Sequence, residues 1–196
     1  MLIVAYPDPF NRTFETMLLQ LIFTLIPLFS SFNHQSGTPV LTNSVDSLTV
    51  YVFLHDECVI SQYYTPQLTE YYNQYKSQKV GFVGYFPNPS LKPYHIKTFA
   101  QNFKLAFPLQ QDYRKDWTKK FGITVTPEVA VWDHRTDLLI YRGRIDDSYV
   151  RVGKRKMHVK SKDLKNVIDA WISGQASSTL VETPAIGCFI NLGMTN

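Results

Sequence analysis

SLTVYVFLHDECVISQYYTP, residues 47–66, is the stretch that decides the fold of this chain. Its first part, Ser47 to His55, is β-branched and aromatic and is apolar on both faces, which favours a central strand covered on both sides. The residues from Ser61 onward repeat at helical spacing and predict a helix that extends to Lys79. Cys58 therefore stands where a buried strand passes into a long helix.

The rest of the chain alternates apolar runs with helical patterns. The elements that we expect are strands at 79–86, 107–112, 126–133 and 138–144, and helices within 87–103, at 113–123 and at 161–174. The first half needs a parallel crossover, whereas the strands at 126–133 and 138–144 are close enough for a hairpin around 134–137. The sequence thus predicts an α/β fold with a mixed central β-sheet and helices on both faces.

Local signals refine these helices. Gly122 is expected to end the helix at 113–123. Ser161 is the predicted N-cap of the closing helix, which Gly174 ends. The stripe of the first helix is interpreted as core packing rather than as a binding face, and it consists of Leu68, Tyr71, Tyr72 and Tyr75.

The two ends of the chain differ from the middle. Residues 1–37 are interpreted as a leader, since the segment from Met17 to Phe32 is similar to the apolar part of a secretory signal, and Met17 is a candidate for the true start. The alternatives are a hydrophobic helix packed on the domain, or an uncleaved anchor in loose association with a membrane. Residues 38–175 then form one domain, and residues 176–196 form an irregular tail that carries Cys188.

Composition excludes several classes of function. The formal net charge of the 196 residues is +4, which is too mild to argue for nucleic-acid binding. The basic run at 151–162 lacks aromatic residues and is interpreted as a solvated loop rather than a phosphate site. No CxxC motif and no histidine pair at ligand spacing occurs, so we expect no structural zinc.

The chain has two cysteines, Cys58 and Cys188. If they paired, closing so long a loop would restrict the unfolded chain by roughly 5 kcal/mol in the entropic account. For Cys188 the sequence leaves three alternatives open, namely a resolving thiol, a structural disulfide and an unused residue. An exported location would favour a disulfide.

Two motifs carry a resemblance to a known family. DECVISQYYTP (residues 56–66) and GITVTPEVAVWD (residues 122–133) together resemble the thioredoxin-like superfamily, and within it the redoxin group of alkyl hydroperoxide reductase and thiol-specific antioxidant proteins. In that group a strand delivers a reactive cysteine to a helix start, where Cys58 stands. A cis proline faces that cysteine, and Thr126–Pro127 matches it. The segments at 141–156 and 183–190 look like one exported, single-domain subgroup.

The resemblance implies a thiol-dependent oxidoreductase or peroxidase with Cys58 as nucleophile. A helix N-terminus carries unpaired N–H groups and partial positive charge, which favour a thiolate. Protonated His55 would help and Glu57 would oppose this effect. Thr126 would offer backbone hydrogen bonds to an extended substrate and Pro127 would shape the site. The implied partner is a thiol or disulfide protein, or a peroxide, and no cofactor or metal is implied.

The departures from the family matter as well. Ser61 stands where a dithiol reductase has its resolving cysteine, and it could only donate a hydrogen bond to the thiolate. His55 stands where peroxiredoxins place a threonine, and Arg142 or Arg144 is the candidate for a peroxide-polarising charge. Three routes therefore remain for Cys58: exchange as a monothiol, pairing with Cys188, or an inert buried residue. The rival function is a non-catalytic thioredoxin-fold module that binds a protein through a degenerate CxxS site.

Overall fold

The computed structural model of the chain describes residues 46–192. The predicted leader at 1–37, the suggested start at Met17 and the last four residues of the tail lie outside the described residues. Within residues 46–192, no helix is both long enough and apolar enough to span a bilayer.

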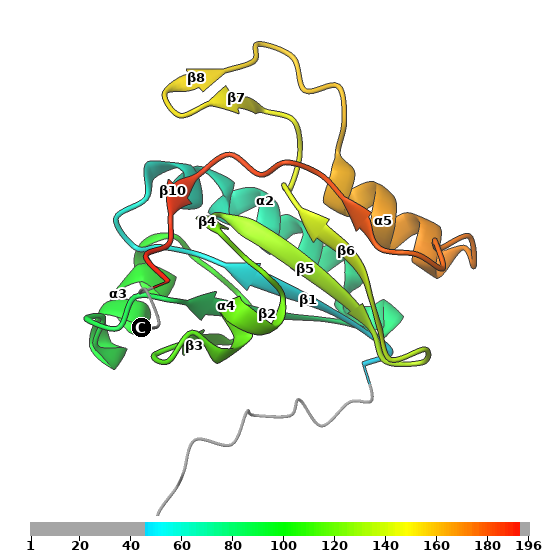
Figure 1. Cartoon of the computed structure of the whole chain (residues 1–196), viewed down its shortest axis with the longest axis horizontal. Helices are drawn as coiled ribbons and strands as arrows, with labels where there is room; N and C mark the ends of the chain where they lie inside the picture. The colour runs from blue at the N-terminus through cyan, green and yellow to red at the C-terminus, as the bar shows by residue number, and fades with distance from the viewer. Residues whose placement is uncertain (1–45, 193–196) are drawn as a thin grey trace, which may run out of the picture. The chain divides into compact units, whose positions relative to one another are not determined.

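A six-stranded sheet organises the described chain (Figure 1), in the order β3-β2-β1-β5-β6-β9. Its strands are β1 (Leu48–Phe53), β2 (Val80–Phe86), β3 (Leu109–Gln111), β5 (Glu128–Asp133), β6 (Leu138–Gly143) and β9 (Val181–Glu182). The helices are α2 (Val59–Tyr75), α3 (Pro93–Asn102), α4 (Asp116–Lys120) and α5 (Asp163–Ile172), with a short 3₁₀ turn η2 (Lys76–Gln78). Two small ladders complete the fold, formed by β4 (Val125–Thr126) with β10 (Cys188–Phe189) and by β7 (Tyr149–Arg151) with β8 (Lys154–Arg155).

Strand β1 lies at the centre of the sheet, as its apolar sequence predicts. It pairs in parallel with β2 and antiparallel with β5. Strands β5 and β6 form the expected antiparallel hairpin, while β2 and β3 are parallel. The predicted mixed central sheet is therefore confirmed, and Cys58 follows the carboxyl end of β1 after a short loop.

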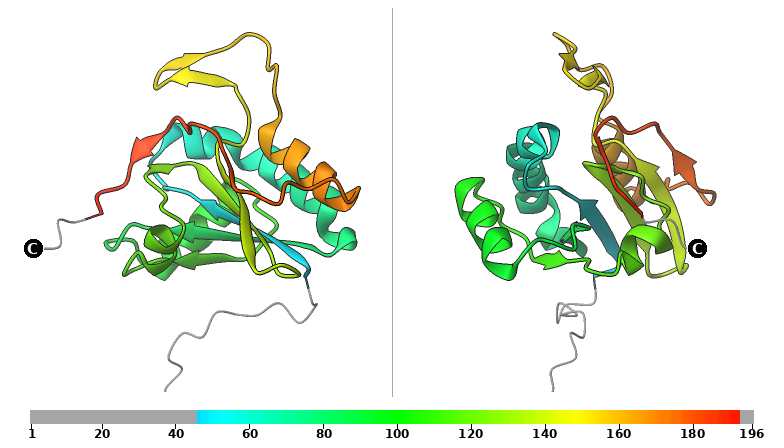
Figure 2. Two further views of the ribbon diagram at one scale, coloured as in Figure 1. Left: turned by 45° about the vertical axis from the view of Figure 1, so that its right-hand side comes forward. Right: turned by 60° about the vertical axis from the view of Figure 1, so that its left-hand side comes forward.

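Side chains that alternate along β1 enter two cores, one on each face of the sheet. Leu48, Val50 and Val52 belong to the larger core, which packs against α2, α3 and α5. Tyr51 and Phe53 belong to the smaller, aromatic core, to which α4 and the residues after it contribute. Figure 2 shows α2 and α3 together on one side of the sheet. Helices thus lie on both faces, as predicted.

Helix α2 continues through an internal proline. Pro66 has no N–H to donate to the Gln62 carbonyl, its normal partner one turn earlier. The Thr65 hydroxyl donates to that carbonyl instead, at 2.7 Å, so the carbonyl keeps a partner. The predicted core stripe is confirmed, with three members buried and one partly buried: Leu68, Tyr71, Tyr75 and Tyr72.

Three local predictions differ from the structure in whole or in part. The N-cap of α5 is Lys162 rather than Ser161, whose hydroxyl instead donates to the Asp163 carboxylate. The basic run is exposed, yet it is partly ordered as the β7–β8 hairpin. The tail is not irregular throughout, because β9 pairs with β6 and β10 pairs with β4. Strands of two residues are too short to show alternation in a sequence.

Candidate functional site

Cys58 is the N-cap residue of α2 and is only 2 % exposed. Its backbone is extended, and its carbonyl accepts the Gln62 N–H at 3.0 Å, the first bond of the helix. The first turn of α2 contains no acidic residue that would offset the partial positive charge of the helix end. The N–H groups of that turn have no partner within the helix and favour negative charge nearby. The position is therefore suited to a thiolate.

The loop before β5 faces this cysteine. The Thr126–Pro127 peptide bond is cis, and the Thr126 carbonyl oxygen lies 3.2 Å from the Cys58 sulfur. Glu128 stabilises the conformation of this loop, because its carboxylate accepts hydrogen bonds from the backbone N–H groups of Thr124 and Val125. Burial raises the pKa of Glu128, and these two hydrogen bonds work in the opposite direction. Glu128 thereby fixes the backbone that presents Thr126.

The C-terminal tail completes the site. Strand β10 runs antiparallel to β4, with Cys188 opposite Thr126. The Ile190 N–H donates to the Thr124 carbonyl at 3.0 Å and extends this ladder. A disulfide joins Cys58 to Cys188, with 6.2 Å between their Cα atoms. The structure thus brings together four of the predicted site residues, Cys58, Thr126, Pro127 and Cys188.

Gly187 allows the tail to lie close to the backbone of Thr126. A Cβ atom at this position would lie 2.2 Å from the Thr126 carbonyl oxygen and 2.6 Å from its carbon. Such contacts with backbone atoms cannot be relieved by rotating a side chain. The glycine before Cys188 is therefore required for the observed approach of β10 to β4.

Ser61 does not take part in this cluster. It is fully buried, and its hydroxyl oxygen accepts the backbone N–H of His55 at 3.2 Å. It therefore closes the loop that leads into α2. His55 accepts the Glu57 N–H through Nδ1 and lies 3.3 Å from the Asp56 carboxylate, while Glu57 is exposed. Ser61 and His55 thus shape the loop that carries Cys58.

The two arginines considered for a peroxide site have other partners. Arg142 donates to the backbone carbonyls of Phe121 and Gly122 and pairs with Glu182. Arg144 pairs with Asp163 at 2.7 Å, which raises the pKa of its guanidinium. Both side chains thus fasten the tail or α5 to the sheet.

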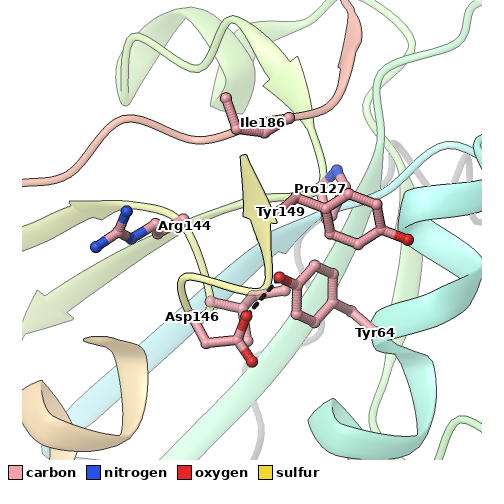
Figure 3. Close-up of a pocket in the computed structure, with 7 residues that line it drawn as sticks. Tyr64, Pro127, Arg144, Asp146, Tyr149 and Ile186 are labelled. Atoms are coloured by element: carbon pink, nitrogen blue, oxygen red, sulfur yellow. Dashed lines mark hydrogen bonds between the residues drawn. The ribbon is translucent and has the colours of Figure 1, made fainter. Parts of the chain in front are cut away.

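A small pocket lies beside the cis proline (Figure 3). Its volume of about 10 Å³ is what a single water molecule needs. On its wall the Tyr64 hydroxyl donates to the Asp146 carboxylate at 2.6 Å, and that carboxylate also accepts the Ser148 N–H. Burial and the neighbouring Asp146 raise the pKa of Tyr64 far above its ordinary value. The pocket also touches Ile186, two residues before Cys188.

Several residues of the site were not predicted from the sequence. Glu128 and Gly187 act through close backbone contacts, for which the sequence has no periodic signal. The bond of Asp146 to the Ser148 N–H is typical of a turn residue, but no pattern in the sequence predicts its contact with Tyr64 on α2. The proline in TVTPEV and the glycine in AIGCFI were the only local hints.

Comparison with known proteins supports the fold. No protein-family model and no curated protein matches the chain. A hypothetical protein from Sinorhizobium meliloti 1021 is 23% identical, with 76% of this chain and 82% of that chain covered and a TM-score of 0.64. An uncharacterized conserved protein from Geobacillus kaustophilus is 25% identical, with 77% of this chain and 80% of that chain covered and a TM-score of 0.65. Neither likeness identifies an activity, which has to be argued from the site.

Proposed function

We propose that this protein is a thiol–disulfide oxidoreductase whose redox pair is Cys58 and Cys188. The observation that carries the proposal is the disulfide between an α2 N-cap residue and a β10 residue held against Thr126. A merely inert cysteine has no need of a partner on a separate strand. The proposed function shares two features with the redoxin group. Cys58 is the nucleophile, and the resolving thiol comes from the tail.

The cycle begins in the reduced protein. The Cys58 thiolate attacks a sulfur of a partner's disulfide, forming a mixed disulfide and releasing the partner's other sulfur as a thiolate. The Cys188 thiolate then attacks the Cys58 sulfur, which closes the observed disulfide and releases the partner's second thiolate. The partner gains two electrons and this protein loses two. Helix α2 assists by stabilising Cys58 as a thiolate.

Re-reduction uses the more accessible cysteine. Cys58 is 2 % exposed, whereas Cys188 is half-buried. An external dithiol therefore attacks the Cys188 sulfur, and Cys58 leaves as the thiolate that the helix end favours. The donor's second thiol then displaces Cys188 and closes the donor's own disulfide. Ser61 has no redox step in this cycle, since its hydroxyl cannot form a disulfide.

Disulfide exchange is favoured over peroxide reduction. Peroxide chemistry would use a positive charge near the thiolate, but Arg142 and Arg144 are occupied by Glu182 and Asp163. His55, which replaces the family's threonine, shapes the loop through Ser61 and Glu57. A binding module without redox chemistry would have no use for a thiolate-stabilising position of Cys58 at the N-cap of α2.

An oxidising compartment suits the pair. Disulfides persist outside the cytoplasm, where thiols tend to be oxidised. We therefore propose export of the domain, with the hydrophobic N-terminal segment as the exporting signal. The partner is a thiol or disulfide protein in the same compartment.

The test is reduction of a fluorogenic peptide disulfide, with dithiothreitol as electron donor. The wild-type protein should accelerate the reaction, and Cys58→Ser should abolish the acceleration. In a single turnover without dithiothreitol, the pre-reduced Cys188→Ser variant should stop after a mixed disulfide that mass spectrometry detects on Cys58. Hydrogen peroxide serves as the competing oxidant. If Cys58→Ser retains the rate, or if only peroxide oxidises the reduced protein, the proposal is wrong.

A further inference from the structure

Residues 149–162 form a projecting arm built around the β7–β8 hairpin (Figure 1, Figure 2). Most of its side chains are exposed, and Met157 is 95 % exposed. The arm contains six Lys and Arg residues and no Asp or Glu, although the net charge of the whole chain is only +4. The positive charge is thus concentrated here, and the remainder of the chain has more acidic than basic residues.

The base of the arm belongs to the neighbourhood of the disulfide. Tyr149 lines the pocket together with Pro127 and Ile186 (Figure 3). On the other side, the Arg155 guanidinium lies 4.6 Å from the ring centre of Tyr63, in the second turn of α2. The ring centres of Tyr149 and Tyr63 are 5.4 Å apart. The base of the arm thus shares a pocket with Pro127, which follows Thr126, and with Ile186, two residues before Cys188.

Asp147 fixes the arm at its middle and near its C-terminal end. Its carboxylate pairs with Lys156 at 2.5 Å and accepts the backbone N–H groups of Lys160 and Ser161. These contacts hold the pKa of Asp147 well below its usual range. The arm is thereby tied to the loop that follows β6.

Several arm charges are left without an opposite charge. Within residues 46–192, Arg151, Lys154, Lys160 and Lys162 form no salt bridge. Arg151 and Lys154 lie opposite each other across the ladder, an arrangement of like charges that destabilises a hairpin. An anionic surface supplied from outside would relieve this repulsion.

We propose that the arm docks the thiol–disulfide partner through an acidic polypeptide segment next to the partner's cysteine. The inference rests on the proposed function and names the chemistry of its partner. Opposite charges would steer the encounter and raise its rate, and salt would screen the effect. A polypeptide is favoured over an anionic membrane because Tyr149 at the base of the arm lines one pocket with Pro127 and Ile186, close in sequence to Thr126 and Cys188, and only a sulfur-bearing partner uses that position.

The experiment compares three disulfide-linked peptide dimers, with acidic, neutral or basic residues around one cysteine, as oxidants of the reduced full chain. Each rate is divided by the rate of the same dimer with dithiothreitol, which removes differences in intrinsic reactivity. The arm variant is Arg151→Glu with Lys154→Glu, which keeps like charges opposite each other. The matched control is Lys79→Glu with Lys97→Glu, since these exposed residues lie outside the arm.

We expect the acidic dimer to react about tenfold faster than the neutral one at low salt, with the advantage lost in about 1 M salt. The arm variant should lose the advantage and the control variant should keep it. Equal normalised rates for the three dimers, or an advantage that survives in the arm variant, would overturn the inference. Arm-dependent binding to anionic phospholipid vesicles without any peptide preference would also overturn it, in favour of a membrane. If no dimer reacts faster with the wild-type protein than with the Cys58→Ser variant, the proposed function itself fails.

Discussion

Cys188 lies directly opposite Thr126 in the β4–β10 ladder, and from this position it forms a disulfide with Cys58. The tail thus occupies the backbone edge that Thr126 would offer to an extended substrate. Strand β10 consists of two residues only. The proposed cycle uses this arrangement, because the tail must leave when Cys58 engages a partner and return to resolve the mixed disulfide.

Replacing Gly187 should weaken the closed state of the tail. In Gly187→Ala the new methyl group would meet the Thr126 carbonyl, so β10 has to shift. Overpacking of this kind costs about 1–3 kcal/mol. The disulfide should therefore open about tenfold more readily, as measured by its equilibrium with glutathione.

The control for this change is Phe189→Ala. Phe189 follows Cys188 directly and is 89 % exposed, so its removal should leave the glutathione equilibrium unchanged. Equal equilibria for Gly187→Ala and the wild type would show that the approach of Gly187 to Thr126 does not hold the tail.

Tyr64→Phe should destabilise the fold around the pocket. The change removes the buried hydrogen bond to Asp146, which then keeps, among the described residues, only the Ser148 N–H and Gln67 as donors. Loss of a bond to a charged group costs about 1.5–3 kcal/mol in the free energy of unfolding, measured by urea denaturation. Tyr63→Phe is the matched control, because its hydroxyl forms no hydrogen bond within residues 46–192. A similar loss in both variants would refute this assignment.

Alkaline pH should destabilise the protein. Burial raises the pKa of six tyrosines: Tyr51, Tyr64, Tyr71, Tyr75, Tyr85 and Tyr141. For Tyr75 the value reaches about 12. The unfolded state loses these protons first, near pH 10, so the free energy of unfolding falls as the pH rises above about 10. Urea unfolding of the oxidised protein at about pH 8 and about pH 11 measures the fall.

The Tyr75→Phe variant isolates the contribution of one tyrosine to this pH dependence of the free energy of unfolding. The variant should lose less stability between the two pH values than the wild type loses, because one raised tyrosine is gone. A free energy of unfolding that stays level above pH 10 would contradict the role of the buried phenols.

Asp147→Asn should loosen the arm without unfolding the body. The amide keeps one acceptor oxygen but loses the charge that pairs with Lys156. Hydrogen exchange should therefore accelerate at Lys160 and Ser161, whose N–H groups Asp147 accepts, and stay unchanged in β1. Unchanged exchange at both residues would mean that Asp147 does not hold the arm.

The sheet and its helices could be predicted because their apolar residues form long runs or recur at helical spacing. The apolar run of β1 predicted its central position, and the stripe of α2 predicted its buried face. The β4–β10 and β6–β9 pairs could not be predicted, since each joins two-residue segments far apart in the chain. Their formation depends on backbone fit, as Gly187 against Thr126 illustrates.

The same distinction applies to the candidate site. Cys58 could be located because it stands between a strand and a helix, and the proline at 127 because Thr126–Pro127 resembles the cis-proline motif of the thioredoxin-like superfamily. The sequence alone leaves the partner of Cys58 open among several alternatives. The roles of Ser61, Arg142 and Arg144 depend on which buried or charged group faces each side chain, and that is decided only by the three-dimensional packing.

The central claim, that Cys58 is an activated nucleophile, is tested most directly by its rate of alkylation with iodoacetamide as a function of pH. The measurement uses the reduced Cys188→Ser variant, in which Cys58 is the only thiol. The account predicts a midpoint well below the free-thiol value of about 8.5, because the N-terminus of α2 favours the thiolate. A midpoint at or above that value, or labelling that begins only when the protein unfolds, would contradict it and favour a binding module without redox chemistry.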